Sequence, residues 1–296
     1  MATLYTQQSK NVRKTWILMT SFFVLVIAIG YIFAYIYNSP GVLYVAVIFS
    51  IVMNIVSYWN SDKIALSLSR AVPADVEQYL ELHRIVENLA ITAGLPKPRV
   101  YIINDSAPNA FATGRNKEHA AVAVTTGLLS ILDKTELEGV IAHELSHVGN
   151  KDILVSTVAV VLAGFISILS HMFLRGMAWG GGRRGGDREG GGVLMIVGIV
   201  LAILAPIFAT LVQLAISRKR EYLADTDGAL LTRYPDGLAN ALQKISAYAA
   251  PMATANNATA HLFIANPFGG GKKLSGLFST HPPIENRIKI LREMGR

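Results

Sequence analysis

Four long runs of apolar residues divide this chain, and none contains Asp, Glu, Lys or Arg. They cover residues 17–37, 42–59, 153–174 and 193–217. A helix needs about 20 predominantly apolar residues to cross the roughly 30 Å hydrocarbon core of a bilayer. The short sequence Asn-Ser-Pro-Gly at 38–41 predicts a tight turn between the first two runs. The pattern therefore predicts four transmembrane helices arranged as two hairpins.

The more polar regions between these runs predict a domain that is mostly helical with a small sheet. Helices are expected where apolar residues recur at helical spacing, and strands where Val, Ile and Tyr are dense or alternate with Ala. The expected helices cover 74–93, 136–148, a region after 218, and 283–294; the expected strands cover 99–103, 109–113 and 119–125. We therefore expect a first membrane hairpin at 1–60, a discontinuous α+β domain at 61–152 and 218–296, and a second membrane hairpin at 153–217.

The composition agrees with a membrane protein. Hydrophobic residues make up 52% of the chain and charged residues 16%, whereas soluble domains carry about 25% charged residues. The net charge of +7 is explained better by basic residues beside anionic lipid than by nucleic acid, because no basic face with interleaved aromatics is present. The first run is too long for a signal peptide and lacks a small-residue cleavage site, so it predicts a retained anchor. The absence of cysteine excludes disulfides and thiolate chemistry.

Residues 143–147, His-Glu-Leu-Ser-His, carry the strongest chemical signal. On a helix, histidines at positions i and i+4 lie one turn apart, about 5–6 Å between their Cβ atoms, so both can reach one zinc ion. Glu144 leans to the same side, where a carboxylate can take a proton from a metal-bound water. Asp133 and Glu136 fit a capping box, which predicts that the helix begins there. His143 and His147 are therefore the candidate metal ligands, and Glu144 is the candidate general base.

A catalytic zinc site uses three protein ligands, so a third must come from another part of the chain. The best candidate is Glu221, which shares a helix face with Asp225 four residues later. Asp225 could accept the free N–H of a ligand histidine and so fix its tautomer. From spacing alone, an exposed acid beside the basic residues 218–220 is an equally good interpretation of Glu221.

The ligands predict the topology, because all of them must lie on one side of the bilayer. An even number of crossings between residues 147 and 221 satisfies this condition. The basic residues at 10–14 and 218–220 then lie on the same side, which the positive-inside rule assigns to the cytoplasm. The glycine-rich segment 180–192 would lie outside, although its arginines favour a second hairpin that enters the membrane only partly. In either case the site is expected close to the membrane surface.

Other candidate sites lack the residues that their chemistry needs. The run Gly-Gly-Gly-Lys at 269–272 lacks the upstream glycine of a phosphate-binding loop, and Lys273 stands where Ser or Thr is required. No nucleotide site is therefore predicted. The remaining histidines outside the two motifs, His83, His119, His171 and His261, have no partner motif and are expected to have no metal role.

Taken together, these motifs resemble HtpX, a family of four-segment membrane zinc metalloproteases of bacteria that is related more distantly to the CAAX prenyl proteases. The resemblance covers essentially the whole chain. It rests on the segments Asn109–Ala112, His143–His147 and Glu221–Asp225, on His281-Pro282-Pro283, and on Arg287. It implies a gluzincin-type metalloprotease domain, one zinc ion per chain, and Glu221 as the third ligand.

The resemblance also assigns roles that spacing leaves open. It makes His281, with Arg287 close by, a candidate to stabilise the oxyanion of the reaction. It makes Asn109, Ala110 and Phe111 candidates to bind an extended polypeptide. It further implies quality control by hydrolysis of misfolded or damaged membrane proteins at the cytoplasmic face of the inner membrane, without nucleotide or nucleic acid.

Two other functions are compatible with the same motifs. A CAAX-type prenyl-peptide protease would use the same chemistry, but four spans offer little material for a large intramembrane chamber. A non-catalytic scaffold could hold zinc for structure, but its fourth position would usually be filled by a protein ligand, and Glu144 would have no role. We therefore expect a membrane zinc metalloendopeptidase.

Overall fold

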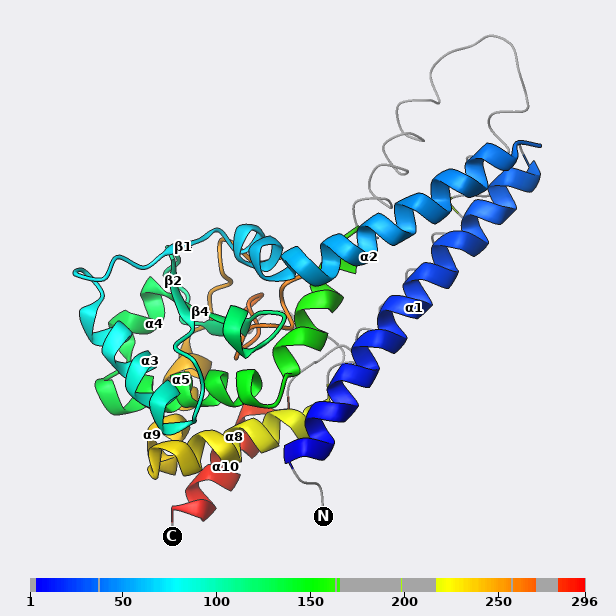
Figure 1. Ribbon diagram of the computed structural model, residues 1–296. Helices are drawn as coiled ribbons and strands as arrows, with labels where there is room; N and C mark the ends of the chain where they lie inside the picture. Colours follow the sequence, from blue (N-terminus) through cyan, green and yellow to red (C-terminus); the bar gives the residue numbers. More distant parts are fainter. Residues whose placement is uncertain are drawn as a thin grey trace.

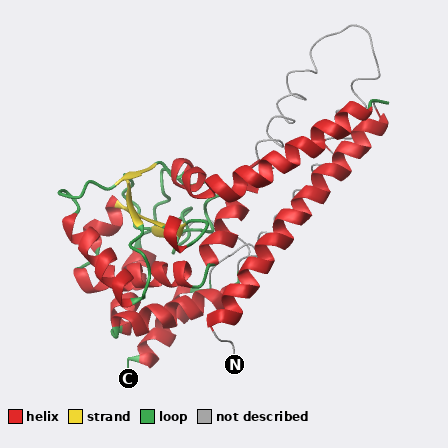
Figure 2. Ribbon diagram, in the orientation of Figure 1, coloured by secondary structure: helices red, strands yellow, loops and turns green. Residues whose placement is uncertain are grey.

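The computed structural model describes residues 4–36, 38–162, 164–165, 198, 217–256, 258–269 and 282–295. A long helical hairpin projects from a domain in which helices surround a small sheet, as Figure 1 and Figure 2 show. The helices are α1 (Leu4–Ile36), α2 (Pro40–Leu68), α3 (Leu80–Thr92), α4 (Thr126–Ile131), α5 (Lys134–Gly149), α8 (Arg218–Thr232), α9 (Pro235–Ala247) and α10 (Ile284–Met294). The strands are β1 (Ala71–Pro73), β2 (Arg99–Ile103), β3 (Ala110–Thr113) and β4 (Ala121–Thr125).

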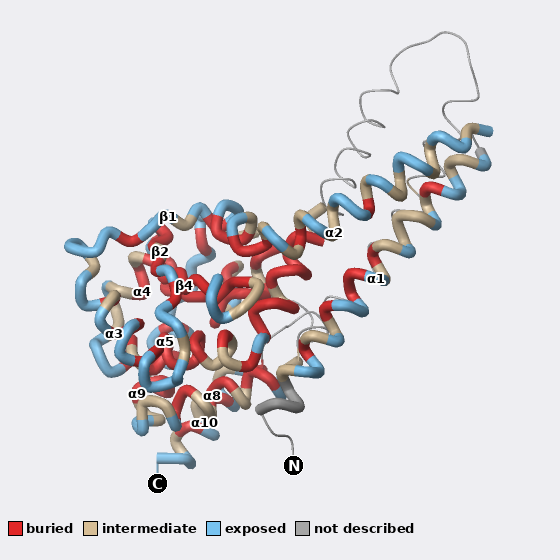
Figure 3. Tube along the Cα trace, in the orientation of Figure 1, coloured by how far each residue is buried: buried red, intermediate tan, exposed pale blue. Residues whose placement is uncertain are grey.

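Helices α1 and α2 form the first predicted hairpin. Over Gln8–Tyr35 and Pro40–Leu68 they are long and apolar enough to cross a membrane. Much of the outer half of the hairpin is exposed (Figure 3). The exposed residues include large apolar side chains such as Tyr35, Tyr44 and Val45, which suits a surface that faces lipid. Helix α2 continues past the expected boundary at residue 60, because Ser61, Ala65 and Leu66 are buried against the domain.

The third apolar run begins as a helix, Asp152–Leu162, that follows α5 at a bend of 84°. This helix is buried in the protein, where Leu154 and Val158 belong to one apolar cluster with Leu18 and Phe22 of α1. The end of the third run from residue 166, nearly all of the fourth run, and the glycine-rich segment 180–192 lie outside the described residues. The described part of the chain holds two candidate spans, or three if α5 and the helix after it form one bent span. The expected count of four stays a prediction.

The sheet is mixed and has the strand order β1-β2-β4-β3. Strands β2 and β4 run parallel, whereas β1 is antiparallel to β2 and β3 is antiparallel to β4. Three of these strands were expected, and β1 was not. It is three residues long and ends at a proline, so it has too little periodicity to be detected. Strand β3 lies at an edge of the sheet and packs against α5.

Helix α5 begins with the predicted capping box. The Asp133 carboxylate accepts a hydrogen bond from the backbone of Glu136, and the Glu136 carboxylate accepts one from the backbone of Asp133, both at 2.9 Å. Helix α3 begins at Leu80, six residues later than expected, because Asp75 caps a preceding turn by accepting from the backbone of Glu77 and Gln78. Helix α5, which carries the His-Glu-Leu-Ser-His motif, therefore begins where its local sequence predicts, whereas α3 does not.

Two glycines let other helices approach α5 closely. A Cβ atom on Gly228 of α8 would lie 2.9 Å from the backbone nitrogen of His143. A Cβ atom on Gly139 of α5 would lie 2.6 Å from the backbone nitrogen of Leu238 in α9. These contacts leave no room for a side chain. They bring the face of α8 that carries Glu221 directly against the histidines of α5.

Candidate metal centre

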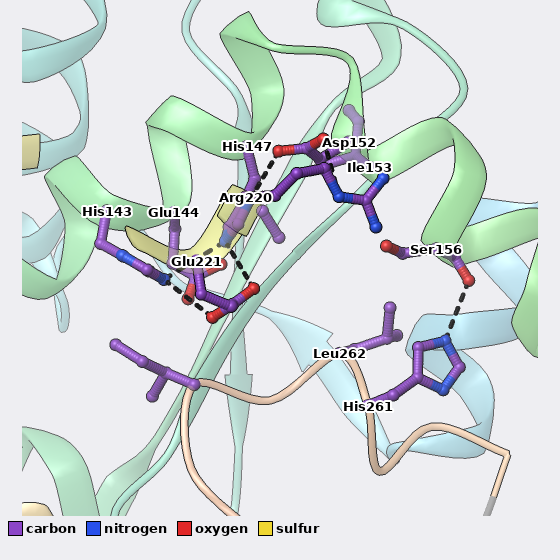
Figure 4. A pocket seen from close by; sticks show the side chains of 12 residues that line it. His143, Glu144, His147, Asp152, Ile153, Ser156, Arg220, Glu221, His261 and Leu262 are labelled. Carbon is purple, nitrogen blue, oxygen red and sulfur yellow. Dashed lines mark hydrogen bonds and ion pairs between the residues drawn. The ribbon is translucent and has the colours of Figure 1, made fainter. Parts of the chain in front are cut away.

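Helix α5 holds the two histidines of the motif side by side, and their Nε2 atoms are 3.2 Å apart. Glu221, in the first turn of α8, points to the same place (Figure 4). Its carboxylate oxygens lie 3.9 Å from Nε2 of His143 and 3.6 Å from Nε2 of His147. In a tetrahedral site with metal–ligand bonds of about 2.0–2.1 Å, ligand atoms are about 3.4 Å apart. The three side chains are therefore placed to share one metal ion.

The outer nitrogens of both histidines face carboxylates. Nδ1 of His143 lies 3.0 Å from Asp225, and Nδ1 of His147 lies 3.0 Å from Asp152. A carboxylate accepts the Nδ1 proton and leaves a lone pair on Nε2 of the neutral ring. Two lone pairs that face each other at 3.2 Å repel unless a proton or a metal cation lies between them. Burial alone would lower the pKa of His147, but its hydrogen bond with Asp152 and the charge of Glu221 raise that pKa to about 9, so a proton takes this place in the metal-free protein. The donor set thus fits a metal ion, and Asp225 occupies the supporting position that the sequence suggested.

Glu144 is buried beside this cluster, next to the edge of the sheet. Its carboxylate accepts a hydrogen bond from the backbone N–H of Ala112 in β3. Burial is the main cause that raises the pKa of Glu144 to about 7, and the charge of Glu221 acts in the same direction, while His147 and Arg287 oppose it. A pKa near the working pH suits a general base. A cation bound to the histidines would lower this pKa again.

Arg287 was expected near the oxyanion, and its guanidinium lies against the ring of His143, with a terminal nitrogen 3.5 Å from each ring nitrogen. Its guanidinium is 0% exposed and donates two hydrogen bonds to the Asp225 carboxylate, at 2.8 and 2.7 Å. A further hydrogen bond reaches the carbonyl of Ile264 at 3.2 Å. Burial alone would raise the pKa of Asp225, but the charge of Arg287 and the hydrogen bonds from His143 and Arg287 together outweigh burial and hold that pKa at about 2. In the structure Arg287 therefore supports Asp225 and is not among the residues that line the cavity. Its role at the oxyanion stays a prediction.

Asn109 was expected to bind substrate, and its side chain instead holds another part of the protein. Its amide nitrogen lies 3.0 Å from the carbonyl oxygen of Ala265, and its amide oxygen lies 3.2 Å from the backbone nitrogen of the same residue. Ala110 and Phe111 have buried side chains inside β3, and the Ala110 carbonyl accepts a hydrogen bond from Ile264. Segment 258–269 is thereby fixed along the edge of β3. Substrate binding by these three residues stays a prediction.

A small cavity of about 30 Å³ lies beside the cluster (Figure 4). Ala112 lines it from the sheet, and Leu262 and Ile264 line it from segment 258–269. His261 also lines it, with Nε2 3.2 Å from the carbonyl oxygen of Ser156. That position lies away from the metal cluster (Figure 4). The expectation that His261 has no metal role stays a prediction. His281 lies outside the described residues, so its predicted role is not tested.

Three residues that sequence analysis missed complete the site. Oδ1 of Asp152 lies 2.6 Å from the side-chain nitrogen of Asn11 and 3.5 Å from Nε of Arg220. Asp152 was treated as the end of a domain, although an acid five residues after His147 and directly before an apolar run was a usable signal. Asn11 and Arg220 had no such signal, because nothing in local spacing links residues 11, 152 and 220.

Known proteins are similar to this chain in sequence and in fold. A family model described as "Peptidase family M48" matches residues 77–295. The chain is 50% identical over 297 residues to "Protease HtpX homolog" of Caldanaerobacter subterraneus subsp. tengcongensis, covering 99% of this chain and 98% of that protein. It is 51% identical over 283 residues to "Protease HtpX homolog" of Pyrococcus furiosus, covering 95% of each.

The fold resembles the crystal structure of S. mikatae Ste24p, with a TM-score of 0.51 and 17% sequence identity. The likeness covers 97% of this chain and 67% of that one. At this identity it supports the fold alone. The family match and the relatives, together with the grouping of His143, His147 and Glu221, confirm the expected class of enzyme. The chain belongs to peptidase family M48 and is a metalloprotease.

Proposed function

We propose that this protein is a zinc-dependent endopeptidase of the bacterial inner membrane that cleaves misfolded or damaged membrane proteins on the cytoplasmic side. The observation that carries this proposal is the cluster of His143, His147 and Glu221 with Glu144 beside it. Two imidazoles and a carboxylate with one open position are a ligand set of catalytic zinc sites. A buried carboxylate beside that open position has a use in proton transfer and none in a purely structural site.

When bound, zinc supplies a Lewis acid that lowers the pKa of water and polarises a carbonyl group. Glu144 accepts the proton of the attacking water and passes it to the leaving amine. Asp225 and Asp152 engage the Nδ1 protons of His143 and His147, so that each Nε2 stays turned toward the metal. His281 donates a hydrogen bond to the developing oxyanion.

The substrate backbone extends along the edge of β3, where Ala112 lines the cavity and contacts Glu144. Backbone hydrogen bonds to a sheet edge give affinity with little sequence preference. The cavity of about 30 Å³ has room for about one water molecule. Leu262 and Ile264 therefore move off the edge when a peptide enters. A folded substrate cannot bind in this way, because its own structure uses its backbone groups.

The position of the site relative to the hairpin supports action near the membrane. We assign the catalytic domain to residues 61–152 and 218–296, the first hairpin to 1–60 and the second to 153–217. Asn11 of α1 contacts the same Asp152 that contacts His147, so the metal site lies beside one end of the hairpin. The basic residues at 10–14 place that end on the cytoplasmic side.

Zinc content and cleavage of an unfolded membrane protein, measured on the same purified samples, test this function. Replacing any one ligand, by His143→Ala, His147→Ala or Glu221→Ala, should lower bound zinc and abolish cleavage. Glu144→Gln should keep the zinc and still abolish cleavage, because it removes only the base. If Glu221→Ala retained stoichiometric zinc and full activity, the ligand assignment would be refuted. If Glu144→Gln cleaved as fast as wild type, the hydrolytic mechanism would be refuted.

A further inference from the structure

The side chain of Asp152 links the metal cluster to the first membrane hairpin. Asp152 follows α5 and begins the next helix, and its side chain is buried. One carboxylate oxygen lies 3.0 Å from Nδ1 of His147. The other lies 2.6 Å from the side-chain nitrogen of Asn11. A single carboxylate therefore contacts a candidate metal ligand on one side and α1 on the other.

The surroundings of Asn11 fix the direction of its amide. Asn11 is 1% exposed. Its side-chain nitrogen donates to Asp152 and, at 2.9 Å, to the carbonyl oxygen of Asn150. Its side-chain oxygen accepts from a terminal nitrogen of Arg220 at 3.1 Å. Every one of these groups matches the donor or acceptor that faces it, so the amide has one orientation.

Arg220 gives the buried carboxylate its counter-charge. Its Nε lies 3.5 Å from the Asp152 oxygen that Asn11 contacts. A buried carboxylate is costly unless it is paired and hydrogen-bonded. Arg220 and Asn11 together meet that requirement and leave the second oxygen of Asp152 for His147. The neighbouring residue of α8 is Glu221, so the same turn supplies the third candidate ligand.

We propose that Asp152 is a positioning residue for His147 and that Asn11 of α1 holds Asp152 in place. The affinity of the site for metal then depends on how α1 is seated against the catalytic domain. This inference rests on the proposed function in one respect, that His147 is a metal ligand. It adds that the first membrane hairpin supports the catalytic centre, which neither the family match nor the motifs assign.

The test compares two leucine variants of α1 in the full-length protein in detergent. Asn11→Leu removes the amide that contacts Asp152. Gln8→Leu is the matched control, because Gln8 lies one turn earlier on α1 and, among the described residues, donates only to the carbonyl of Gly149, at 2.7 Å. Zinc affinity is measured by competition with a chromophoric chelator. Asn11→Leu should weaken zinc binding about 10-fold, near the lower end of the effect of losing a partner of a ligand histidine, whereas Gln8→Leu should change it less than twofold.

Two further variants of the same network separate positioning from simple loss of fold. Asp152→Asn should weaken zinc binding by about 10–100-fold. It should also shift the visible absorption of the cobalt-substituted protein, and lower kcat at saturating zinc more than it changes KM. The double variant Asn11→Asp/Asp152→Asn exchanges amide and carboxylate and restores a hydrogen bond between the two positions. With the single variant Asn11→Asp measured beside Asp152→Asn, the loss of zinc affinity in the double variant should be smaller than the product of the two single-variant losses.

The outcomes are distinct from those of the proposed function. Unchanged zinc affinity and cobalt spectrum in Asn11→Leu and Asp152→Asn would overturn the inference, as would equal losses in Asn11→Leu and Gln8→Leu. If Asn11→Leu fails to fold, as judged from thermal unfolding of the metal-free protein, Asp152→Asn and the double variant decide the question. A wild-type protein that bound zinc but cut no polypeptide would refute the proposed function. The zinc affinities of the variants would still decide this inference. A wild-type protein that bound no zinc would refute both.

Discussion

At the scale of single residues, the burial that raises the pKa of Glu144 also lowers the stability of the metal-free fold when Glu144 ionises. Its carboxyl group is 2% exposed, and burial raises its pKa to about 7. The ordinary value in an unfolded chain is 4.5, so the metal-free folded protein holds this proton up to a higher pH than the unfolded chain does. Folding therefore favours the protonated form, and ionising Glu144 destabilises the metal-free fold.

We predict that Glu144→Gln stabilises the metal-free protein at pH 8 and not at pH 4. The stability that wild type draws from the raised pKa is complete below about pH 4.5 and is lost as the pH rises through about 7. At 1.36 kcal/mol per pKa unit, the free energy of unfolding of the wild type falls by on the order of 3 kcal/mol between pH 4 and pH 8. The glutamine variant has no group to ionise at this position and keeps that stability. Thermal unfolding in chelator at the two pH values measures the difference. An equal change in stability at both pH values would contradict this explanation.

At the scale of secondary-structure elements, the site depends on how closely α8 approaches α5. Glu221, Asp225 and Gly228 recur at intervals of four and three residues, so they share one face of α8. The glycine meets the backbone of His143, where an added Cβ would be 2.9 Å from the nitrogen and 3.1 Å from Cα. Both partners are backbone atoms of a helix and cannot rotate away. The short distance between the helices is what lets a glutamate reach the metal cluster.

We predict that Gly228→Ala separates α8 from α5 and weakens metal binding together with the fold. The loss of stability should be about 1–3 kcal/mol, the usual cost of forcing an extra methyl group into a packed interface. Zinc affinity and thermal unfolding are the measurements. Gly41→Ala is the control, because among the described residues its Cβ would have only Ser39 Oγ within 4 Å, at 3.7 Å. Gly228→Ala with wild-type zinc affinity would show that Glu221 does not depend on this approach.

At the scale of the whole molecule, the hairpin of α1 and α2 is both a candidate membrane anchor and a part of the domain. Its outer half is largely exposed (Figure 3). Leu18 and Phe22 of α1 are instead buried with the helix Asp152–Leu162. Anchoring and catalysis are therefore joined in one structure. The orientation of the hairpin decides on which side of the membrane substrates are cut.

We predict that the catalytic domain faces the cytoplasm. The chain has no cysteine, so single cysteines can be introduced by Ser39→Cys, Gly186→Cys and Ser275→Cys and probed in intact cells with an impermeant thiol reagent. Ser39→Cys should be labelled from outside, and Ser275→Cys only after the cells are opened. Labelling of Ser275→Cys in intact cells would reverse the proposed orientation. Gly186→Cys should be labelled from outside if the second hairpin spans the membrane, and its protection would favour a hairpin that enters only partly.

We also predict that the purified protein cuts loosened substrates without nucleotide. No phosphate-binding loop is present in the sequence, and the cavity beside the metal cluster, about 30 Å³ in volume, does not admit folded structure. Cleavage of a membrane protein should rise when that protein is destabilised and should map to its flexible cytoplasmic loops and ends. Equal rates on a tightly folded soluble domain and on its unfolded form, or a requirement for ATP, would contradict this.

Features that depend on neighbours in the sequence could be predicted without the structure. The capping box at Asp133 and Glu136 and the turn-by-turn spacing of His143 and His147 are set within one helix, and both are present. The apolar runs at the start of the chain predicted the hairpin for the same reason. The exact lengths of α1 and α2 were not predicted, because their polar ends remain helical through packing against the domain.

The sequence alone determined the chemistry of the site, and the tertiary structure decided what surrounds it. Arg287 was expected at the oxyanion and lies against Asp225, while Asn109 holds Ala265. The contact of Asn11 with Asp152 joins residues 141 positions apart. Such contacts follow from which helices pack together and at what distance, and side-chain spacing within one helix carries no information about that. The metal ligands could be found in the sequence because two of them share a helix, whereas the groups that hold them come from separate elements that meet only in the folded protein.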